Sequence, residues 1–390
     1  MRNPLSKKIT GIAPSGIRKF FDVANEMEGV ISLGVGEPDF DTPWRIREEG
    51  IFSLERGRTF YTSNAGLMEL RTEICRYLER KIHVSYSPKT ETMVTVGGSE
   101  AIDVALRCML EPGEEVLIPQ PSYVSYLPCT VMADGVPVIV ELKNENEFKL
   151  TVEDLESKVT EKSKILIMPF PNNPTGSIMT KEDLEPIAEF VLEHDLYVIS
   201  DEIYSELSYK GDHVSIASLP GMRDRIIVIN GFSKGFAMTG WRLGYCCGPE
   251  LILTQMIKLH QYAIMCAPTN SQYAALEGLR NCEEDVQEMR NAYNQRRRFL
   301  MHEFKRMGLD CFEPFGAFYV FPSIKKFGMT SDEFATKLLM EEKVAVVPGT
   351  AFGDCGEGFL RISYAYSLED LKAALERLER FIQKLNVTEQ

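Results

Sequence analysis

From about residue 90 to residue 262, short runs rich in β-branched residues alternate with longer stretches of helical character. Such alternation is typical of βαβ units, in which parallel strands form a sheet covered by helices on both faces. The pattern therefore predicts an α/β fold with a mostly parallel, seven-stranded sheet. The expected strands are Thr92–Val96, Glu115–Pro119, Pro137–Leu142, Lys164–Met168, Leu196–Ser200, Ile226–Asn230 and Arg242–Cys247, and the expected helices are Ser99–Leu110, Tyr123–Asp134, Lys181–His194 and Glu250–Tyr262.

Around Asn281 the pattern changes. A long, charge-rich helical stretch, Glu283–Met307, precedes shorter expected strands at Phe318–Phe321 and Val344–Val347, and Glu369–Leu385 reads as an amphipathic helix. These elements predict a second, smaller α+β domain. The predicted division is an N-terminal arm over 1–14, a part of the small domain over 15–46, a large domain over 47–283 and the rest of the small domain over 284–390.

Composition limits the class of protein. The 390 residues carry a formal net charge of −14, which argues against nucleic-acid and anionic-membrane partners because both require a basic face. The nine cysteines include no CxxC pair and the five histidines are scattered, so we expect reduced thiols and no metal site. No run reaches the length of a membrane span and the first residues lack an apolar signal core. We therefore expect a cytoplasmic protein that acts on small molecules.

Within Ser233–Tyr245, Lys234 stands eight residues before Arg242, with small residues, two glycines and a tryptophan between them. A lysine amine is chemically useful only when neutral, which requires a dry or cation-rich site. An arginine offers a rigid fork of donors that suits a phosphate or a carboxylate. An amine beside a phosphate fork fits a cofactor that carries both an aldehyde and a phosphate, and pyridoxal 5′-phosphate (PLP) has this chemistry.

Two other motifs in the chain would indicate different chemistry, but the residues around each of them do not fit the structure that the motif requires. Residues 231–235 match the G-x-S-x-G nucleophile elbow of hydrolases, but Gly235 and Gly240 interrupt the helix that should follow. Residues 34–39 begin like a dinucleotide-binding G-x-G-x-x-G, yet Asp39 stands where the third glycine belongs and Pro38 breaks the helix. Neither a hydrolase nor a nicotinamide site is expected.

Several polar residues follow the expected strands, where the loops of a doubly wound sheet converge. Asp201 follows one strand and suits a protonated ring nitrogen, Asn173 stands in a turn after another, and Ser99 begins a helix whose free N–H groups suit a phosphate. Arg361 lies inside a β-like run, where a buried arginine can bind a carboxylate. With Lys234 these residues supply aldehyde capture, ring protonation, phosphate binding and substrate binding.

The order of these motifs resembles the class I aminotransferases of PLP fold type I, over nearly the whole chain. Within that family the chain is most similar to the prokaryotic aromatic aminotransferases and the related enzymes of lysine biosynthesis. The motifs are Gly36-Glu37-Pro38-Asp39-Phe40, Tyr61 with Gly66 and Glu69-Leu70-Arg71, Asn173-Pro174-Thr175-Gly176, Ser200-Asp201-Glu202-Ile203-Tyr204, Ser233-Lys234, Gly240-Trp241-Arg242 and Arg361-Ile362-Ser363.

The resemblance implies a role for each matching residue. Lys234 would bond the cofactor's aldehyde as a Schiff base and later shuttle a proton, and Asp201 would pair with the ring nitrogen. Tyr204 and Asn173 would contact the phenolate oxygen of the ring, and Tyr123 would stack on its face. These implied contacts cover the reactive half of the cofactor.

The resemblance also implies residues for the phosphate and for a second subunit. Ser99, Glu100, Ser233 and Arg242 would hold the phosphate group. Tyr61 would reach the phosphate of the neighbouring subunit, which implies a homodimer with two shared active sites.

For the substrate, the resemblance implies that Arg361, with Asn173 and the Gly36 backbone, binds the α-carboxylate. Aspartate-specific relatives carry a lysine where this chain has Ser99, so an aromatic or other bulky amino donor is favoured, with a 2-oxo acid such as 2-oxoglutarate as acceptor in a ping-pong reaction. Arg18 is an alternative source of positive charge. The alternative hypotheses are an aspartate or N-acetyl-diaminopimelate aminotransferase, a PLP-dependent cystathionine β-lyase and a non-catalytic PLP-binding regulator. The regulator is not favoured, because such proteins carry a basic helix-turn-helix segment and none is found here.

Overall fold

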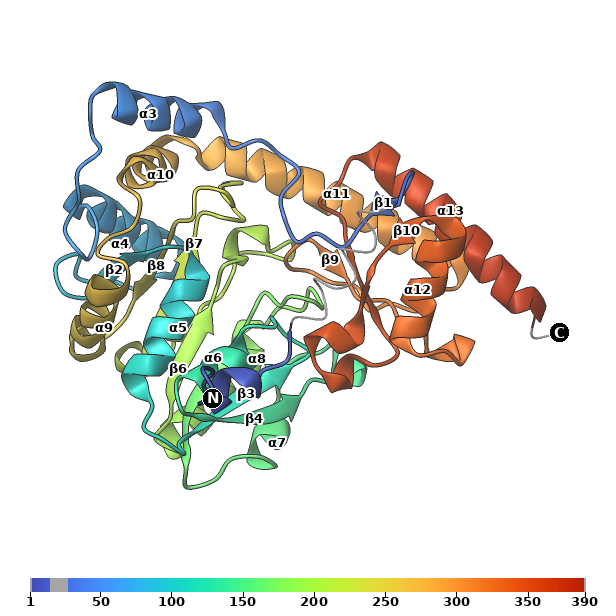
Figure 1. Cartoon of the computed structure of the whole chain (residues 1–390), viewed down its shortest axis with the longest axis horizontal. Helices are drawn as coiled ribbons and strands as arrows, with labels where there is room; N and C mark the ends of the chain where they lie inside the picture. The colour runs from blue at the N-terminus through green and yellow to red at the C-terminus, as the bar shows by residue number, and fades with distance from the viewer. Residues whose placement is uncertain (1, 15–26, 389–390) are drawn as a thin grey trace.

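The computed structural model describes residues 2–14 and 27–388, and its largest part is a sheet flanked by helices (Figure 1). The strand order is β2-β8-β7-β6-β5-β3-β4. β8 runs antiparallel to both of its neighbours, and the other neighbouring strands are parallel. This mostly parallel, seven-stranded sheet confirms the predicted fold class. The strands are β2 (Thr92–Thr95), β3 (Glu115–Gln120), β4 (Val136–Glu141), β5 (Ser163–Met168), β6 (Tyr197–Asp201), β7 (Ile226–Gly231) and β8 (Gly244–Cys247).

Helices connect these strands, and three of them, α5, α8 and α9, begin and end within one residue of the predicted bounds. α6 is shorter than predicted: it begins at Tyr126 because Tyr123 belongs to the preceding turn, and it ends at Met132, shortly before Asp134 adopts a left-handed φ of 65°. α3, α4, α7 and α10 were not predicted. The helices are α3 (Trp44–Glu55), α4 (Met68–Ile82), α5 (Gly98–Met109), α6 (Tyr126–Met132), α7 (Val152–Glu156), α8 (Lys181–Glu193), α9 (Glu250–Ala263) and α10 (Thr269–Asn281).

Both faces of the sheet are apolar, as a sheet between two helical layers requires. In β5, Ile165 and Ile167 join a buried cluster that contains side chains of α5, α6 and α9. Leu166 and Met168 point to the opposite face and join the larger cluster, which contains side chains of α4, α8 and α10. Burying one such side chain contributes about 1.5–3 kcal/mol, so the alternation along each strand fixes the sheet firmly between its two layers.

The predicted strand over 242–247 begins two residues later than expected. Arg242 has a left-handed φ of 52° and cannot belong to an extended strand, so β8 begins at Gly244. A glycine is required at that position because a Cβ atom on Gly244 would lie 2.6 Å from the carbonyl carbon of Gly97. β8 therefore packs directly against the backbone that leads into α5.

A smaller α+β unit lies beside the sheet, and α11 (Glu283–Met307) runs from one to the other with the bounds predicted from the sequence (Figure 1). Its three-stranded antiparallel sheet has the order β11-β12-β9, and a separate parallel pair joins β1 to β10. The domain boundaries themselves remain predictions. The further elements are β1 (Ile31–Ser32), β9 (Tyr319–Val320), β10 (Val344–Ala345), β11 (Val347–Pro348), β12 (Leu360–Ser363), α12 (Ser331–Glu342) and α13 (Leu368–Thr388).

The N-terminal helix α1 (Lys7–Thr10) lies against the end of α6. The Lys8 amine is 2.6 Å from the Asp134 carboxylate and also donates to the Met132 carbonyl oxygen at 3.2 Å. The described N-terminal residues are thus attached to α6, in the helical layer that covers one face of the large sheet. Across the described residues, no helix is long and apolar enough to cross a membrane.

Candidate active site

The site lies at one edge of the large sheet. β2, β3, β5, β6 and β7 all point the same way, so their carboxyl ends meet there. A cavity of about 510 Å³ opens at this edge and reaches Arg361 of β12 in the smaller unit. The predicted residues that line it are Gly36, Ser99, Tyr123, Asn173, Asp201, Tyr204, Ser233, Lys234, Arg242 and Arg361.

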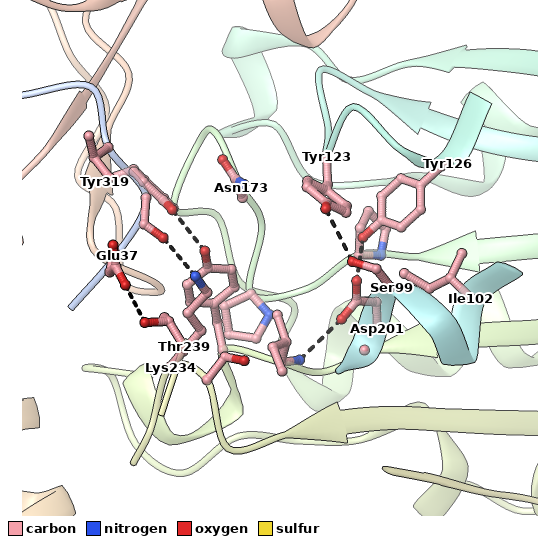
Figure 2. Close-up of a pocket in the computed structure, with 18 of the residues that line it drawn as sticks. Glu37, Ser99, Ile102, Tyr123, Tyr126, Asn173, Asp201, Lys234, Thr239 and Tyr319 are labelled. Carbon is pink, nitrogen blue, oxygen red and sulfur yellow. Dashed lines mark hydrogen bonds between the residues drawn. The ribbon is translucent and has the colours of Figure 1, made fainter. Parts of the chain in front are cut away.

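Lys234 follows β7 and projects its amine into the middle of this cavity (Figure 2). Its Nζ donates a hydrogen bond to the Gly36 carbonyl oxygen, 2.6 Å away. Burial lowers the pKa of Lys234 to about 8; Glu37 acts in the opposite direction, while Arg361 and Arg242 lower the pKa further. A substantial fraction of the amine is therefore neutral near pH 8, and only the neutral amine is a nucleophile.

Asp201 ends β6 and is buried, with 7% of its surface exposed. Its Oδ2 accepts a hydrogen bond of 2.7 Å from the Tyr126 hydroxyl, and its Oδ1 accepts one of 3.2 Å from the Ile203 N–H. Burial raises the pKa of Asp201, and these two hydrogen bonds oppose that change by stabilising the carboxylate. A buried carboxylate of this kind is well suited to a cationic N–H group of a bound ring.

Arg361 enters the cavity from the smaller unit with 3% of its surface exposed. Nη1 donates to Asn173 Oδ1 at 2.9 Å and Nη2 donates to the Gly34 carbonyl oxygen, while Nε is buried without a partner. The guanidinium carbon lies 4.5 Å from the centroid of the Tyr319 ring and 4.8 Å from that of Phe352. The two rings hold the planar fork in one orientation, which suits a carboxylate.

The start of α5 and Arg242 form a second anion-binding region. Free backbone N–H groups at a helix N-terminus favour a phosphate, and Ser99 stands in this first turn. A Cβ atom on Gly97 would lie 2.7 Å from Arg242 Nη2, so the glycine gives the guanidinium room to approach the helix start. Arg242 itself has the left-handed φ noted above, which costs about 1–2 kcal/mol for a residue with a side chain. Such strain is common at binding sites.

The cavity also holds several aromatic hydroxyl groups. The Tyr204 and Tyr319 hydroxyls are 2.8 Å apart. The Tyr123 hydroxyl is 3.2 Å from Ser99 Oγ (Figure 2). Tyr123 stands edge-on to Tyr126, with ring centroids 5.6 Å apart. These tyrosines supply apolar ring faces and hydrogen-bonding tips in the same space, as recognition of a polar aromatic ligand requires.

Two of the predicted residues do not line the cavity, and Arg18 lies outside the described residues. The Glu100 carboxylate turns back to the Val96 N–H and to the buried imidazole of His260, 2.5 Å from its Nδ1, so the side chain does not face the phosphate region. Tyr61 is 81% exposed on the surface. A contact of Tyr61 with a second subunit remains a prediction.

The structure brings in four side chains to which the sequence analysis gave no role. Tyr126 makes a hydrogen bond to Asp201, and Tyr319 makes one to Tyr204. Glu37 and Thr239 line the cavity and are hydrogen-bonded to each other. A signal for Tyr126 existed, because it stands three residues after Tyr123 at the start of an expected helix. The contact of Glu37 with Thr239 joins residues 202 positions apart, and nothing in the sequence indicated it.

Residues 28–378 match the family model for aminotransferase class I and II. The chain belongs to this family. It is 49% identical over 387 residues to the aspartate aminotransferase of Pyrococcus abyssi, covering 98% of this chain and 100% of the relative. It is 47% identical over 383 residues to the aromatic-amino-acid aminotransferase 2 of Thermococcus litoralis, covering 97% and 98%. The solved aromatic aminotransferase from Pyrococcus horikoshii superposes with a TM-score of 0.90 at 47% identity, covering 95% and 99%.

Aminotransferases of this class use PLP, and the cavity fits that cofactor. The buried Asp201 carboxylate has the charge to match a protonated ring nitrogen, and the α5 N-terminus with Arg242 has the charge to match a phosphate. The Lys234 amine lines the same cavity, and the Arg361 Nε, which has no partner, adds an unused donor to it. The residues present therefore fit the aldehyde, ring and phosphate of the cofactor.

Tyr126→Phe tests the support that Asp201 receives. A hydrogen bond to a charged group contributes about 1.5–3 kcal/mol, so the cofactor-free variant is expected to bind PLP about 10- to 100-fold more weakly. Removing the hydroxyl raises the pKa of Asp201 further. As the pH falls, Asp201 is therefore protonated sooner and no longer offers a carboxylate to the ring nitrogen of PLP. The deficit should therefore be larger at pH 6 than at pH 8, measured by quenching of intrinsic fluorescence on cofactor addition.

Tyr86→Phe is the matched control, because the Tyr86 hydroxyl is buried without a partner and lies outside the cavity. It should bind PLP as tightly as the unaltered protein at both pH values. Equal affinities for Tyr126→Phe and the unaltered protein would show that the hydroxyl does nothing for Asp201.

Proposed function

We propose that this aminotransferase moves the α-amino group of an L-amino acid with an aromatic or other bulky side chain to a 2-oxo acid such as 2-oxoglutarate. The observation that carries the proposal is a cavity lined by both the Lys234 amine, whose lowered pKa lets it become neutral, and the Arg361 guanidinium, which suits a carboxylate. Because donor and acceptor would both use this guanidinium, they bind in turn. The expected kinetics are ping-pong, with the first product leaving before the second substrate binds.

Each residue has a separate task in this proposal. PLP, when bound, supplies an electron sink that stabilises negative charge at the substrate Cα. Lys234 Nζ gives up its contact with the Gly36 oxygen and moves a proton to or from that Cα, with a pKa of about 8 that suits both directions. Asp201 keeps the ring nitrogen protonated, and Arg361 holds the α-carboxylate so that Cα lies within reach of Lys234.

The preference for bulky donors rests on the charges around the cavity. Among the described residues that line it, the cations are Lys234, Arg242 and Arg361, and each has a task above. Ser99 adds no positive charge for the distal carboxylate of aspartate. The relative from Thermococcus litoralis named for aromatic amino acids supports this preference, whereas the relative from Pyrococcus abyssi named for aspartate supports the alternative.

Lys234→Ala tests the proposed function. The purified holoenzyme should lose its visible absorption band and its transfer of nitrogen from phenylalanine to 2-oxoglutarate, because no second lysine is found among the described residues that line the cavity. Lys258→Ala is the matched control, since Lys258 lies on α9 and donates to Gln255 away from the cavity. A Lys234→Ala protein with full turnover would overturn the proposal. Release of ammonia and pyruvate from a sulfur amino acid, without transfer to 2-oxoglutarate, would identify a β-lyase instead.

Ser99→Lys tests the specificity. A new partly buried ion pair is worth roughly 1–3 kcal/mol, so the ratio of kcat/KM for aspartate to that for phenylalanine should rise about 10- to 100-fold. Ser99→Ala shortens the side chain without adding charge and should leave the ratio unchanged. The ratio is the quantity to compare, because either change alters the phosphate region. If the unaltered enzyme already prefers aspartate strongly, the aromatic assignment is wrong and Arg18 becomes the first candidate for the missing charge.

We also propose that two copies of the chain form the working enzyme. Phe60, Tyr61 and Tyr262 expose 80%, 81% and 88% of their surfaces, an unusual set of large rings to leave in water. The loop around Tyr61 is nevertheless held in place, since Phe60 O accepts from Thr269 Oγ1 at 2.7 Å. Rings exposed on a fixed loop fit an interface in which Tyr61 reaches the cofactor phosphate of the neighbouring subunit.

Sedimentation at micromolar concentration should therefore give a mass twice the 44.2 kDa of one chain. Phe60→Asp places a charge in the proposed interface and should shift the protein toward the monomer, with a parallel loss of cofactor affinity. Leu368→Asp changes an exposed residue at the start of α13 and should leave the dimer intact. A monomeric unaltered protein with full activity would contradict the proposal.

A further inference from the structure

Four consecutive residues, Gly34 to Glu37, line the cavity, and each makes a hydrogen bond to a residue far away in the sequence. Gly34 O accepts from Arg361 and Gly36 O accepts from Lys234 Nζ. Between them, the Val35 N–H donates to the Tyr366 hydroxyl at 3.1 Å. The segment is thus bound to both cations that serve the substrate. Its position is linked directly to that of the Lys234 amine.

The fourth contact comes from a side chain. The Glu37 carboxylate accepts a hydrogen bond from the Thr239 hydroxyl, on the loop that joins Lys234 to Arg242 (Figure 2). Glu37 is exposed to solvent on one side and lines the cavity on the other. The Glu37 carboxylate is thus held by the loop between Lys234 and Arg242, and it does not belong to the apolar core. Its charge therefore calls for a functional account.

The charges that face Lys234 show what Glu37 contributes. Arg361 and Arg242 are cations and disfavour a proton on the amine, as burial does, whereas Glu37 and Asp201 favour it. Asp201 has its own partner in the Tyr126 hydroxyl and is reserved for the cofactor ring. The Tyr204 ring, 5.9 Å from Nζ, carries no charge because burial raises the pKa of its hydroxyl well above the ordinary value. Among the described groups whose charge acts on Lys234, Glu37 is thus the carboxylate that remains to offset the two arginines.

We propose that Glu37 is a positioning residue for the reaction: anchored by Thr239, it keeps the Gly34–Glu37 segment beside Lys234 and favours the protonated form of the Lys234 nitrogen. An amine among cations would otherwise hold its proton too weakly to return it to a reacting carbon. Glu37 raises the protonated fraction at neutral pH without contacting the amine. This inference rests on the assignment of Lys234 as the catalytic lysine.

Glu37→Gln removes the charge and keeps a side chain that can bond to Thr239. In the cofactor-free protein, the pH dependence of acylation of Lys234 by an amine reagent, followed by peptide mass spectrometry, should give a Lys234 pKa lower by about 0.2–0.7, since an exposed carboxylate acts through screened solvent. The visible band of the holoenzyme should titrate at a correspondingly lower pH. The first readout does not depend on turnover, so it can fail or succeed whether or not the proposed function stands.

Asp39→Asn is the matched control. Asp39 lies two residues after Glu37, just beyond the Gly34–Glu37 segment, and its Oδ1 is 2.7 Å from Arg296 Nη1. Its replacement removes an equal charge and an ion pair next to the segment but not the charge beside Lys234, so the Lys234 pKa should stay at its original value. Thr239→Val, which frees the carboxylate, should lower the pKa by less than Glu37→Gln does.

The outcomes separate the explanations. A lower pKa in Glu37→Gln with an unchanged pKa in Asp39→Asn supports the inference. An unchanged pKa in Glu37→Gln overturns it. An equal decrease in Asp39→Asn would show that any disturbance of the segment produces the effect, which would also overturn the specific role of Glu37.

Discussion

Parallel pairing of the strands is the constraint on which the site depends. Because β5, β6 and β7 point the same way, the turn with Asn173, the carboxylate of Asp201 and the amine of Lys234 arrive at one edge although they are far apart in sequence. Two apolar faces hold that sheet between helices, and β8 brings the start of α5 close through Gly244. The smaller unit adds Arg361 from the other side. The cavity exists where these two units meet.

The electrostatics of the cavity are opposite to those of the whole chain. A chain with a net charge of −14 gathers Lys234, Arg242 and Arg361 around a volume of about 510 Å³. Cations held together in a partly dry space are costly, and anionic ligands relieve that cost. A phosphate and a substrate carboxylate are such ligands, so the charge distribution favours binding of both. Glu37 and Asp201 limit the cost while keeping Lys234 able to gain and lose a proton.

Short-range patterns predicted most of the sheet and the polar residues that follow its strands. The cavity tyrosines Tyr123 and Tyr204 were implied only by the family resemblance, and about half of the lining was not predicted. Strand runs, turn residues and the residues that follow them are neighbours in the chain, and parallel pairing brings their ends together. The strand start at Arg242 was misjudged because its left-handed backbone is set by the loop and not by its residue type. The family resemblance implied that Glu100 would hold the phosphate, but its carboxylate bonds to the buried imidazole of His260. Long-range side-chain pairs leave no periodic signal.

The central claim is that the amine of Lys234 carries the cofactor. The direct measurement is reduction of the holoenzyme with borohydride, which fixes an aldehyde cofactor to the amine that holds it, followed by digestion and peptide mass mapping. The account predicts that the added mass lies on Lys234 in nearly all molecules, because among the described residues it is the lysine that lines the cavity. Mass added at another lysine, with Lys234 unmodified, would contradict the account.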